Sequence, residues 1–353
     1  MPATKNKRGT WNAKFYYLDW NGIKRQKKKE GFKTKKEALD FEREFLGKCK
    51  TSVDILFKDL VELYMEDSKV HVKPTTYENK KHMIDTKILP YFGEIRLCDI
   101  NIAMVRKWQN KLISDEANYE KTYLKCIHNQ LSAIFNFAVK YYKLPANPAA
   151  QCGTMGKKKA YSMKFWTKEE FDIFIESVLD DPLTKAIFYL FFYSGIREGE
   201  LLALTYDDFD FTKNTVNISK TYARLKGEDL IQEPKTPKSK RTVVLPEEVM
   251  DIIKEYKDKL YSYEPSERFF NISKSFLTRE MVRGCKLSSV KKIRIHDLRH
   301  SHASLLIEMN IPILLISERL GHENIETTLE TYAHLYPNKH EDVAKKLSNV
   351  MNS

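Results

Sequence analysis

Residues 294–304 read Arg-Ile-His-Asp-Leu-Arg-His-Ser-His-Ala-Ser, and this stretch combines histidine and arginine at helical spacing. The pattern predicts the opening of a helix on which His296 and Arg299 share one face. An imidazole donor beside a planar guanidinium with five N–H groups suits the non-bridging oxygens of a phosphate. His300 and His302 leave a metal site open as an alternative, although no HExxH or CxxC spacing accompanies them.

A second arginine lies upstream, just after a strongly apolar segment. Residues 194–204 read Ser-Gly-Ile-Arg-Glu-Gly-Glu-Leu-Leu-Ala-Leu, which places Arg197 at a turn between two predicted helices. Glu200 lies three residues further on, close enough to hold the Arg197 guanidinium by a charge-assisted hydrogen bond. The alternative is an ion pair with a purely structural role.

A lysine-rich loop follows between two predicted strands, residues 215–219 and 241–245. It reads Glu-Pro-Lys-Thr-Pro-Lys-Ser-Lys-Arg over residues 233–241, so Lys235 lies near the tip of a predicted hairpin. Such a lysine can swing toward a bound phosphodiester on its flexible stem. Most hairpin lysines are merely solvated, so this feature indicates little by itself.

The C-terminal side of the opening stretch leads to a tyrosine. Residues 320–334 read Leu-Gly-His-Glu-Asn-Ile-Glu-Thr-Thr-Leu-Glu-Thr-Tyr-Ala-His. We expect the glycine to end one helix, His322 to follow it, and Tyr332 to lie ten residues later on the next helix. A single tyrosine on an amphipathic helix is usually a core or surface residue, so Tyr332 gains meaning only from the order of the whole series.

That ordered series resembles the tyrosine recombinase family, the phage-type integrases: Arg197, Lys235, His296-x-x-Arg299, Gly321-His322 and Tyr332. The resemblance implies a site-specific DNA recombinase that integrates and excises a mobile element. Such an enzyme cleaves and rejoins DNA through a 3′-phosphotyrosine intermediate and a Holliday junction. The resemblance also implies a mixed, mainly helical catalytic domain with a small β-sheet over residues 165–353.

Each residue of the series takes a role from this resemblance. It implies that Tyr332 is the nucleophile, that Arg197 and Arg299 stabilise the transition state, and that Lys235 is the general acid. It also implies that His296 accepts or shuttles the tyrosine proton and that His322 donates to the phosphate. Glu200 would hold an arginine of the site without touching the substrate. Lys238 and Lys240 lie in the same loop, and Lys235 is preferred because the family's lysine begins such a Pro-Lys-Thr stretch. The chain has no GxxxxGK[ST] loop and no paired-carboxylate metal signature, so neither a cofactor nor a metal is expected.

The first 50 residues predict an arm-type DNA-binding domain, a small three-stranded sheet braced by one helix. Apolar residues alternate from Trp11, the hairpin signal Asn21-Gly22 follows, and the capping box Thr34-Lys-Lys-Glu37 opens a helix. A β-ribbon can enter a DNA major groove while basic residues beside it neutralise phosphates. The candidates on one strand are Lys24, Arg25, Lys27, Lys28 and Lys29. A solubilising tail is the alternative.

Residues 51–150 predict an all-helical bundle that corresponds to the family's core-binding domain. Helical periodicity recurs through this segment, and four or five short helices are enough to enclose one core. Pro74 suits the first turn of a helix that runs to about Leu89. Asp99 is expected to cap the helix that follows.

Two segments lie outside these domains. Residues 151–164 form a predicted basic linker, in which Lys157, Lys158 and Lys159 either track a DNA backbone or are ordinarily solvated. The C-terminal tail, about residues 338–351, has apolar positions at helical spacing. It docks either on a neighbouring protomer or on its own domain.

Charge is unevenly distributed over the 353 residues. The net charge of +12 divides into +9 for residues 1–50, +5 for residues 51–160 and −2 for the remainder, a bias that points to a polyanion. The longest apolar run, residues 186–193, is too short to span a bilayer, and five scattered cysteines indicate free thiols. We therefore expect a DNA-associated protein of a bacterial cytoplasm, and exclude membrane proteins, disulfide scaffolds and fibrous proteins.

The expected partner is double-stranded DNA, bound at core and arm sites by a homotetramer, with a DNA-bending or directionality factor as a further candidate. Two rival functions stay open. A type IB topoisomerase shares the chemistry, but the arm-like domain argues against it. A non-catalytic DNA-binding regulator derived from an integrase would have no need of the intact series.

Overall fold

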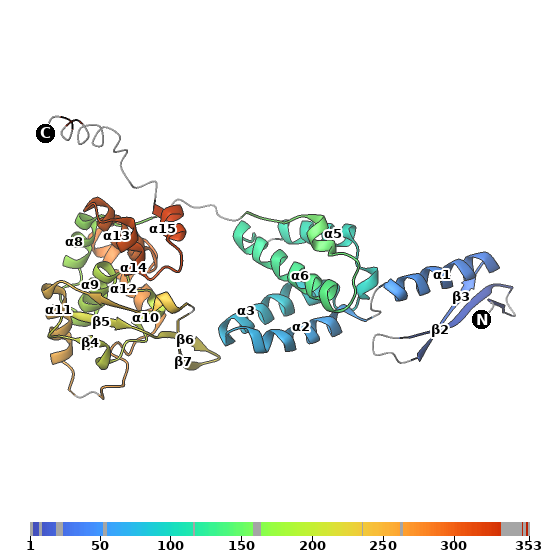
Figure 1. The fold of residues 1–353 in the computed structure, drawn as a ribbon, viewed down its shortest axis with the longest axis horizontal. Coiled ribbons are helices and arrows are strands. Elements are labelled where there is room, and N and C mark those ends of the chain that lie inside the picture. The colour runs from blue at the N-terminus through green and yellow to red at the C-terminus, as the bar shows by residue number, and fades with distance from the viewer. Residues whose placement is uncertain are drawn as a thin grey trace. The chain divides into compact units, whose positions relative to one another are not determined.

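A computed structural model describes residues 3–6, 9–18, 24–51, 55–115, 117–157, 164–234, 236–261, 264–332, 348 and 351. The chain divides into two compact units, residues 1–161 and residues 162–353. The predicted fold class is confirmed: a three-stranded sheet with one helix, a helical bundle, and a mainly helical domain with small sheets (Figure 1). In the part of the chain that the structure describes, no helix is long and apolar enough to cross a membrane.

The N-terminal sheet is antiparallel, with its strands in the order β1-β2-β3. Its strands are β1 (Thr4–Lys5), β2 (Trp11–Leu18) and β3 (Lys24–Phe32). Helix α1 (Lys35–Thr51) begins after Thr34, whose hydroxyl accepts a hydrogen bond from the Glu37 amide at 3.1 Å. The predicted Asn21-Gly22 turn lies outside the described residues.

Six α-helices make up the bundle that follows. They are α2 (Phe57–His71), α3 (Pro74–Met83), α4 (Leu89–Phe92), α5 (Ile102–Ile113), α6 (Lys121–Tyr141) and α7 (Pro148–Cys152). One apolar cluster fills the bundle and includes the fully buried rings of Phe57, Trp108 and Phe135. Aromatic residues of this segment therefore serve mainly as core.

The helix predicted to run from Pro74 to about Leu89 is not a regular α-helix throughout. A π-helical segment, Ile84–Ile88, separates α3 from α4. Pro90 explains the interruption, because proline has no N–H to donate and its ring crowds the carbonyl one turn earlier. The sequence marked the start of the helix correctly and missed this change of pitch.

The expectation that Asp99 caps the next helix is wrong. Asp99 lies in a short 3-10 turn, Leu97–Asp99, and Asn101 is the capping residue of α5. The Asn101 side-chain oxygen accepts a hydrogen bond from the Met104 amide at 3.0 Å. Both residue types are good caps, and the chain uses the one that lies immediately before the first helical turn.

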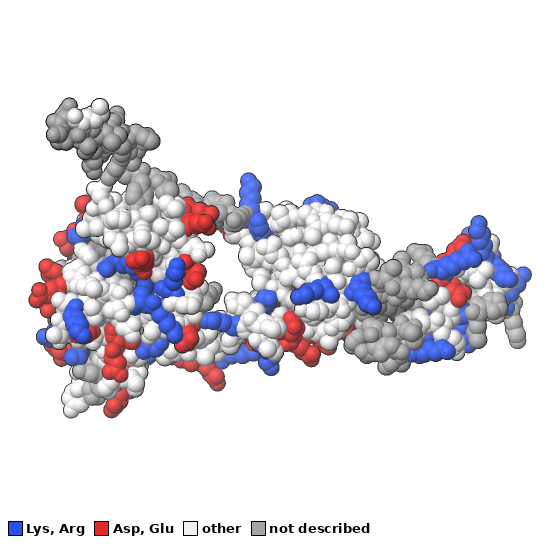
Figure 2. Space-filling view, viewed as in Figure 1, with Lys and Arg blue, Asp and Glu red and all other residues white. Residues whose placement is uncertain are grey.

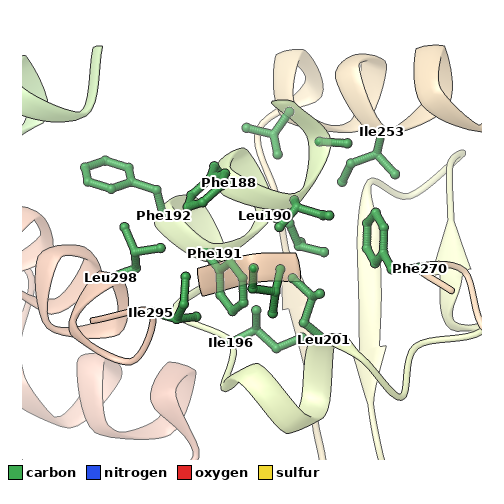
Figure 3. Packing of buried hydrophobic residues seen from close by; sticks show 14 of the residues in the cluster. Phe188, Leu190, Phe191, Phe192, Ile196, Leu201, Ile253, Phe270, Ile295 and Leu298 are labelled. Atoms are coloured by element: carbon green, nitrogen blue, oxygen red, sulfur yellow. The ribbon is translucent and has the colours of Figure 1, made fainter. Parts of the chain in front are cut away.

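The C-terminal unit is mainly helical. Its helices are α8 (Lys168–Glu176), α9 (Pro182–Ser194), α10 (Glu198–Leu201), α11 (Glu247–Asp258), α12 (Lys274–Ser288), α13 (Asp297–Glu308), α14 (Ile313–Leu320) and α15 (Ile325–Tyr332). Helix α9 is apolar on most sides and lies in the middle of the core, where Phe188, Phe191 and Phe192 meet side chains from α11 and α13 (Figure 3). This buried helix fixes the position of the turn that follows it.

Two small sheets accompany these helices. Strands β4 (Phe209–Asp210), β5 (Thr215–Ile218) and β8 (Arg241–Val244) form an antiparallel sheet. Between β5 and β8 the chain inserts a separate hairpin of β6 (Thr221–Leu225) and β7 (Glu228–Gln232). The sequence predicted β5 and β8 but not this hairpin, because its strands are largely polar and Tyr222 is its only fully buried residue among those described.

Candidate active site

Arg197 lies at the joint between α9 and α10. Gly195 ends α9 in the left-handed conformation, with φ of 64°, and the chain turns into α10 directly after Arg197. A β-carbon at Gly195 would meet His302 Cδ2 at 2.7 Å, so glycine is required for two separate reasons. The turn leaves the Arg197 side chain 32% exposed, accessible to a ligand in solvent.

Glu200 holds two arginines at once. Its Oε1 accepts a hydrogen bond from Arg197 Nη1 at 2.6 Å, and its Oε2 accepts one from Arg241 Nη2 at 3.0 Å. Burial alone would raise the pKa of this carboxyl, but Arg241 and then Arg197 lower it to about 2. The contact that the sequence predicted between Glu200 and Arg197 is present, and Glu200 is ionised at neutral pH.

Arg241, the first residue of β8, was not singled out in the sequence. Its side chain is only 7% exposed and donates to Glu200, to the Arg319 carbonyl at 2.9 Å and to the Ser239 carbonyl at 3.0 Å. It therefore joins the lysine loop to α10 and to the end of α14. An arginine at the start of a strand gives no local signal for such a role, because all but one of these partners are far away in sequence.

Arg299 is buried and is held by two main-chain carbonyls at helix C-termini. Its Nη1 donates to Gly195 O at 2.8 Å and its Nη2 to Leu320 O at 2.6 Å. Arg197 Nη2 in turn donates to Gly321 O at 3.2 Å. The last carbonyls of a helix have no partner within it and carry partial negative charge, so the ends of α9 and α14 are natural binding points for guanidinium groups. Burial, followed by Arg197 and Arg241, lowers the pKa of Arg299 to about 9.

Tyr332 is the last residue of α15 and is buried. Its side chain is 1% exposed and packs in a small apolar cluster with residues of α13 and α14. Burial raises the pKa of the hydroxyl to about 12, although the charge of Arg299 acts in the opposite direction. The Tyr332 hydroxyl lies 2.6 Å from Nδ1 of His300.

The neighbour of the Tyr332 hydroxyl is thus His300, whereas the sequence assigned the tyrosine proton to His296. The His296 and His300 rings meet edge to face, with centroids 5.4 Å apart. Partial desolvation followed by Arg299 lowers the pKa of His296, and desolvation followed by His296 lowers the pKa of His300 to about 4. Both rings are neutral at pH 7. The i, i+4 spacing of the pair was the signal that could have drawn attention to His300.

His322 follows the end of α14, as the sequence predicted. Gly321 ends that helix with φ of 67°, and the Nδ1 atom of His322 lies 2.7 Å from the Thr328 hydroxyl on α15. Burial, followed by Arg299 and Arg197, lowers the pKa of His322 to about 3. His322 is consequently neutral, with one ring nitrogen engaged by Thr328.

His302 serves the packing of the domain. Its Nδ1 donates to Phe192 O at 2.8 Å, and its Nε2 accepts from Arg319 Nε at 3.1 Å. Burial and the charge of Arg319 lower its pKa to about 3. In the described residues, no group of three or more histidine, cysteine or acidic side chains is arranged to hold a metal ion.

The lysine loop borders the same region. Lys235 lies outside the described residues. Lys238 Nζ donates to the Glu323 carbonyl at 2.9 Å, and Lys240 pairs with Glu233 at 2.7 Å. An open cleft of about 700 Å³ lies between this loop and the segment that joins α14 to α15, next to His322.

The five basic residues predicted on the N-terminal strand β3 divide between the two faces of the sheet. Cross-strand pairing places Lys29 opposite Ala13, Lys27 opposite Phe15 and Arg25 opposite Tyr17, on the face that α1 covers. Lys24 and Lys28 lie on the open face, where Lys14 is paired with Lys28. Lysine and arginine are also prominent over this region in the surface view (Figure 2).

Of the three linker lysines, Lys157 has a described position. Its amide donates to Lys121 O at 3.2 Å. Lys158 and Lys159 lie outside the described residues, as does the C-terminal tail apart from residues 348 and 351.

Comparison with known proteins adds three family matches. The Phage integrase family matches residues 165–339, the phage integrase N-terminal SAM-like domain residues 56–113, and the Arm DNA-binding domain residues 3–49. The ICEBs1 integrase of Bacillus subtilis is 31% identical over 90% of this chain and 91% of its own length. A XerC-like tyrosine recombinase of Caldanaerobacter subterraneus is 27% identical over 96% of this chain and 97% of its own.

Solved structures share the fold. The Tn1549 transposon integrase, in complex with transposon right end DNA, superposes with a TM-score of 0.69 at 16% identity, covering 85% of this chain and all of that one. A lambda integrase dimer bound to a core site gives 0.60 at 17% identity, covering 96% of this chain and 95% of that one. The chain is similar to an integrase over nearly its full length, and the family match covers its catalytic half. The chain therefore belongs to the phage integrase family and is a tyrosine site-specific recombinase.

Proposed function

We propose that Tyr332 attacks the scissile phosphodiester of a mobile element's attachment site and that the same residues later rejoin the strands. In this step the Tyr332 oxygen forms a bond to phosphorus while the bond from phosphorus to the 5′-oxygen breaks. The product is a 3′-phosphotyrosine and a free 5′-hydroxyl. The covalent bond stores the energy of the broken one, so rejoining needs no external energy source.

One observation carries this proposal: the carbonyl ends of α9 and α14 hold Arg197 and Arg299 in one place, although the two helices are far apart in sequence. Two guanidinium groups fixed side by side suit the charge that develops on the non-bridging oxygens of a phosphate under attack. Removing a comparable fixed donor in other enzymes costs about 2.7–4 kcal/mol of transition-state stabilisation.

His322 fits the role of a hydrogen-bond donor to the phosphate. In its neutral form, a ring nitrogen that accepts the Thr328 proton leaves the hydrogen on the opposite nitrogen, Nε2. Thr328 would thereby select the tautomer that offers an N–H to the substrate. His296 is exposed, lies three residues before Arg299 and has a pKa lowered by desolvation and by Arg299, so it can take up the proton that Tyr332 loses.

For the proton that the leaving 5′-oxygen receives, Lys235 remains our proposal. The two other lysines of the loop have partners: Lys238 donates to the Glu323 carbonyl, and Lys240 pairs with Glu233. The ammonium groups of Lys238 and Lys240 are thus already engaged, which does not favour either lysine as the general acid. The loop also borders the cleft beside His322, where a DNA strand would lie.

The partner we propose is double-stranded DNA, at core sites for the bundle and catalytic domain and at arm sites for the N-terminal sheet. Domain boundaries near residues 50, 150 and 165 follow from this assignment. Integrase structures with the same fold were solved on DNA, one of them as a lambda integrase tetramer on a Holliday junction. A tetramer on DNA is the matching proposal here, with Lys157, Lys158 and Lys159 along the backbone and a DNA-bending or directionality factor as an added component.

The decisive experiment uses a nicked suicide substrate, on which the cleaved strand diffuses away and the covalent adduct accumulates. We expect Tyr332→Phe to reduce the adduct to background while DNA binding changes less than about twofold, because only the nucleophilic oxygen is lost. A protein–DNA adduct that persists in Tyr332→Phe would contradict the assignment. DNA binding without cleavage by the wild-type protein would favour the non-catalytic regulator.

A further inference from the structure

Helix α15, which carries Tyr332, is held to the domain by few side chains. Thr328 and Tyr332 are its buried residues, at 0% and 1% exposure. The apolar side chains of Ile325 and Leu329 are instead 36% and 41% exposed. Burial of apolar surface therefore accounts for only part of the attachment, and the polar contacts of the two buried residues gain importance.

Each of those two residues contacts a histidine. The Tyr332 hydroxyl lies 2.6 Å from His300 Nδ1, and the Thr328 hydroxyl lies 2.7 Å from His322 Nδ1. The two histidines come from different parts of the domain, one on α13 and one after α14. A buried hydroxyl without a partner is unfavourable, so each bond favours the docked helix.

The docked helix does not present its tyrosine to a substrate. At 1% exposure, with its hydroxyl occupied by His300, Tyr332 has no surface that a phosphorus atom could approach. Attack therefore requires α15 to move and the contact with His300 to break. The low pKa of His300, about 4, keeps the ring uncharged, so this contact is available at neutral pH.

We propose that His300 is a positioning residue whose contact with Tyr332 keeps α15 docked in the DNA-free protein, and that this contact sets how often the helix is released. The proposal rests on the assignment of Tyr332 as the nucleophile. It gives His300 a function distinct from proton transfer, for which His296 remains our proposal. His300 acts through Tyr332 and not on the substrate.

Hydrogen exchange of the DNA-free protein measures this release directly. We expect His300→Leu, which keeps the bulk of the side chain but removes the polar atom, to accelerate exchange in the peptide over residues 321–332 by about three- to tenfold, the effect of one lost hydrogen bond. Peptides from α9 and α11 should exchange as in the wild type. Thr331→Val is the matched control, because among the described residues the Thr331 hydroxyl donates to Thr327 O, within α15 itself.

Two conservative variants separate the contact from the bulk of the ring. Asn carries a polar atom near the position of Nδ1, whereas Gln places it near Nε2. His300→Asn should therefore restore wild-type exchange and His300→Gln should not, and this comparison also serves if the leucine variant fails to fold. The proposal would be overturned if His300→Leu left exchange over residues 321–332 unchanged. It would also be overturned if Thr331→Val accelerated this exchange as much as His300→Leu does.

A double-mutant cycle tests the pair itself. Because Tyr332→Phe already lacks the hydroxyl, adding His300→Leu should accelerate exchange no further. A second full acceleration would mean that His300 acts on something other than Tyr332. The outcome is independent of the proposed chemistry: an adduct formed by Tyr332→Phe would refute the nucleophile assignment, yet leave the exchange results intact.

Discussion

At the scale of single residues, Glu200 and Arg241 show how Arg197, which we propose as catalytic, is kept in place. Glu200 is 3% exposed and shares its two oxygens between Arg197 and Arg241. A buried carboxylate is tolerated only when its charge is compensated, and here two guanidinium groups provide that compensation. Arg241 touches no substrate in our assignment, but the position of Arg197 depends on it through Glu200.

We therefore expect Arg241→Met to lower the free energy of unfolding by about 3–5 kcal/mol, because it leaves a buried carboxylate with one partner fewer. Denaturant unfolding measures the loss. Arg241→Lys is the matched control: it keeps the charge but cannot reach Glu200, the Arg319 carbonyl and the Ser239 carbonyl at once. It should lose less stability than the methionine variant. A loss under about 1 kcal/mol in Arg241→Met would show that the network is not coupled.

Glu200 also predicts a dependence of stability on pH. Its pKa in the folded protein is about 2, below the usual 4.5, so its stabilising contribution is complete above pH 4.5 and is lost as the pH falls toward 2. The shift corresponds to about 3 kcal/mol. We expect the stability difference between wild type and Glu200→Gln to be largest at pH 7 and to shrink at pH 3. Denaturant unfolding at both pH values checks this, and an equal difference at the two would contradict it.

At the scale of the elements, the N-terminal sheet separates basic residues by face. Lys27 and Lys29 extend over the aromatic rings of Phe45 and Phe41 on α1, with their ammonium groups 5.2 Å and 4.7 Å from the ring centroids. No helix among the described residues covers the open face, and there Lys24 lies over Tyr16 at 4.9 Å. A major groove can receive the open face only, because α1 occupies the other.

The sheet thus predicts unequal effects for the lysines on its two faces. Replacing the open-face residues Lys14, Lys24 and Lys28 by alanine should reduce the salt slope of arm-site binding by up to about 2.7, or 0.9 per phosphate contact. Lys27→Ala with Lys29→Ala is the control, and we expect a smaller change in slope together with a loss of stability. Titrations at several salt concentrations measure both. Equal slopes for the two sets would place DNA elsewhere.

Elements also show what the sequence could and could not reveal. Periodic apolar residues indicated the helices of the bundle, and the capping signal at Thr34 and Glu37 marked the start of α1. The β6–β7 hairpin was not predicted from the sequence, because its stability depends on neighbouring elements and not on an apolar pattern of its own. A β-carbon at Gly199 of α10 would meet Thr221 Oγ1 at 2.7 Å, which reflects close packing that no local pattern predicts. The contacts of Arg241 and His300 could not be predicted either, because most of their partners are distant in sequence.

At the scale of the whole molecule, the charge is concentrated away from the chemistry. Residues 1–50 carry +9, whereas the catalytic half carries −2. The sheet and α1 have a hydrophobic core of their own, which includes Ala13, Phe15 and Ala38 and is separate from the core of the bundle. We therefore expect that deleting the N-terminal sheet and α1 separates DNA affinity from catalysis.

Removing residues 1–50 should abolish arm-site binding and flatten the salt dependence of total DNA binding. Cleavage of a core-site suicide substrate should survive at protein concentrations high enough to saturate it, because the residues that we propose as catalytic all lie beyond residue 196. Adduct yield and the salt slope are measured on the same preparation. An unchanged salt slope would show that the basic N-terminus does not contact DNA.

Main-chain carbonyls hold Arg299 and help to hold Arg197, the two arginines that we propose as catalytic. Gly195, Leu320 and Gly321 each contribute a carbonyl oxygen, an atom that every amino acid possesses. Substitutions that preserve the two helix ends can therefore accumulate around the site without displacing it. Such tolerance to evolutionary drift accounts for a fold shared with the Tn1549 integrase at only 16% identity. A recombinase built in this way can diverge widely in the DNA sequences it reads while its cutting machinery stays the same.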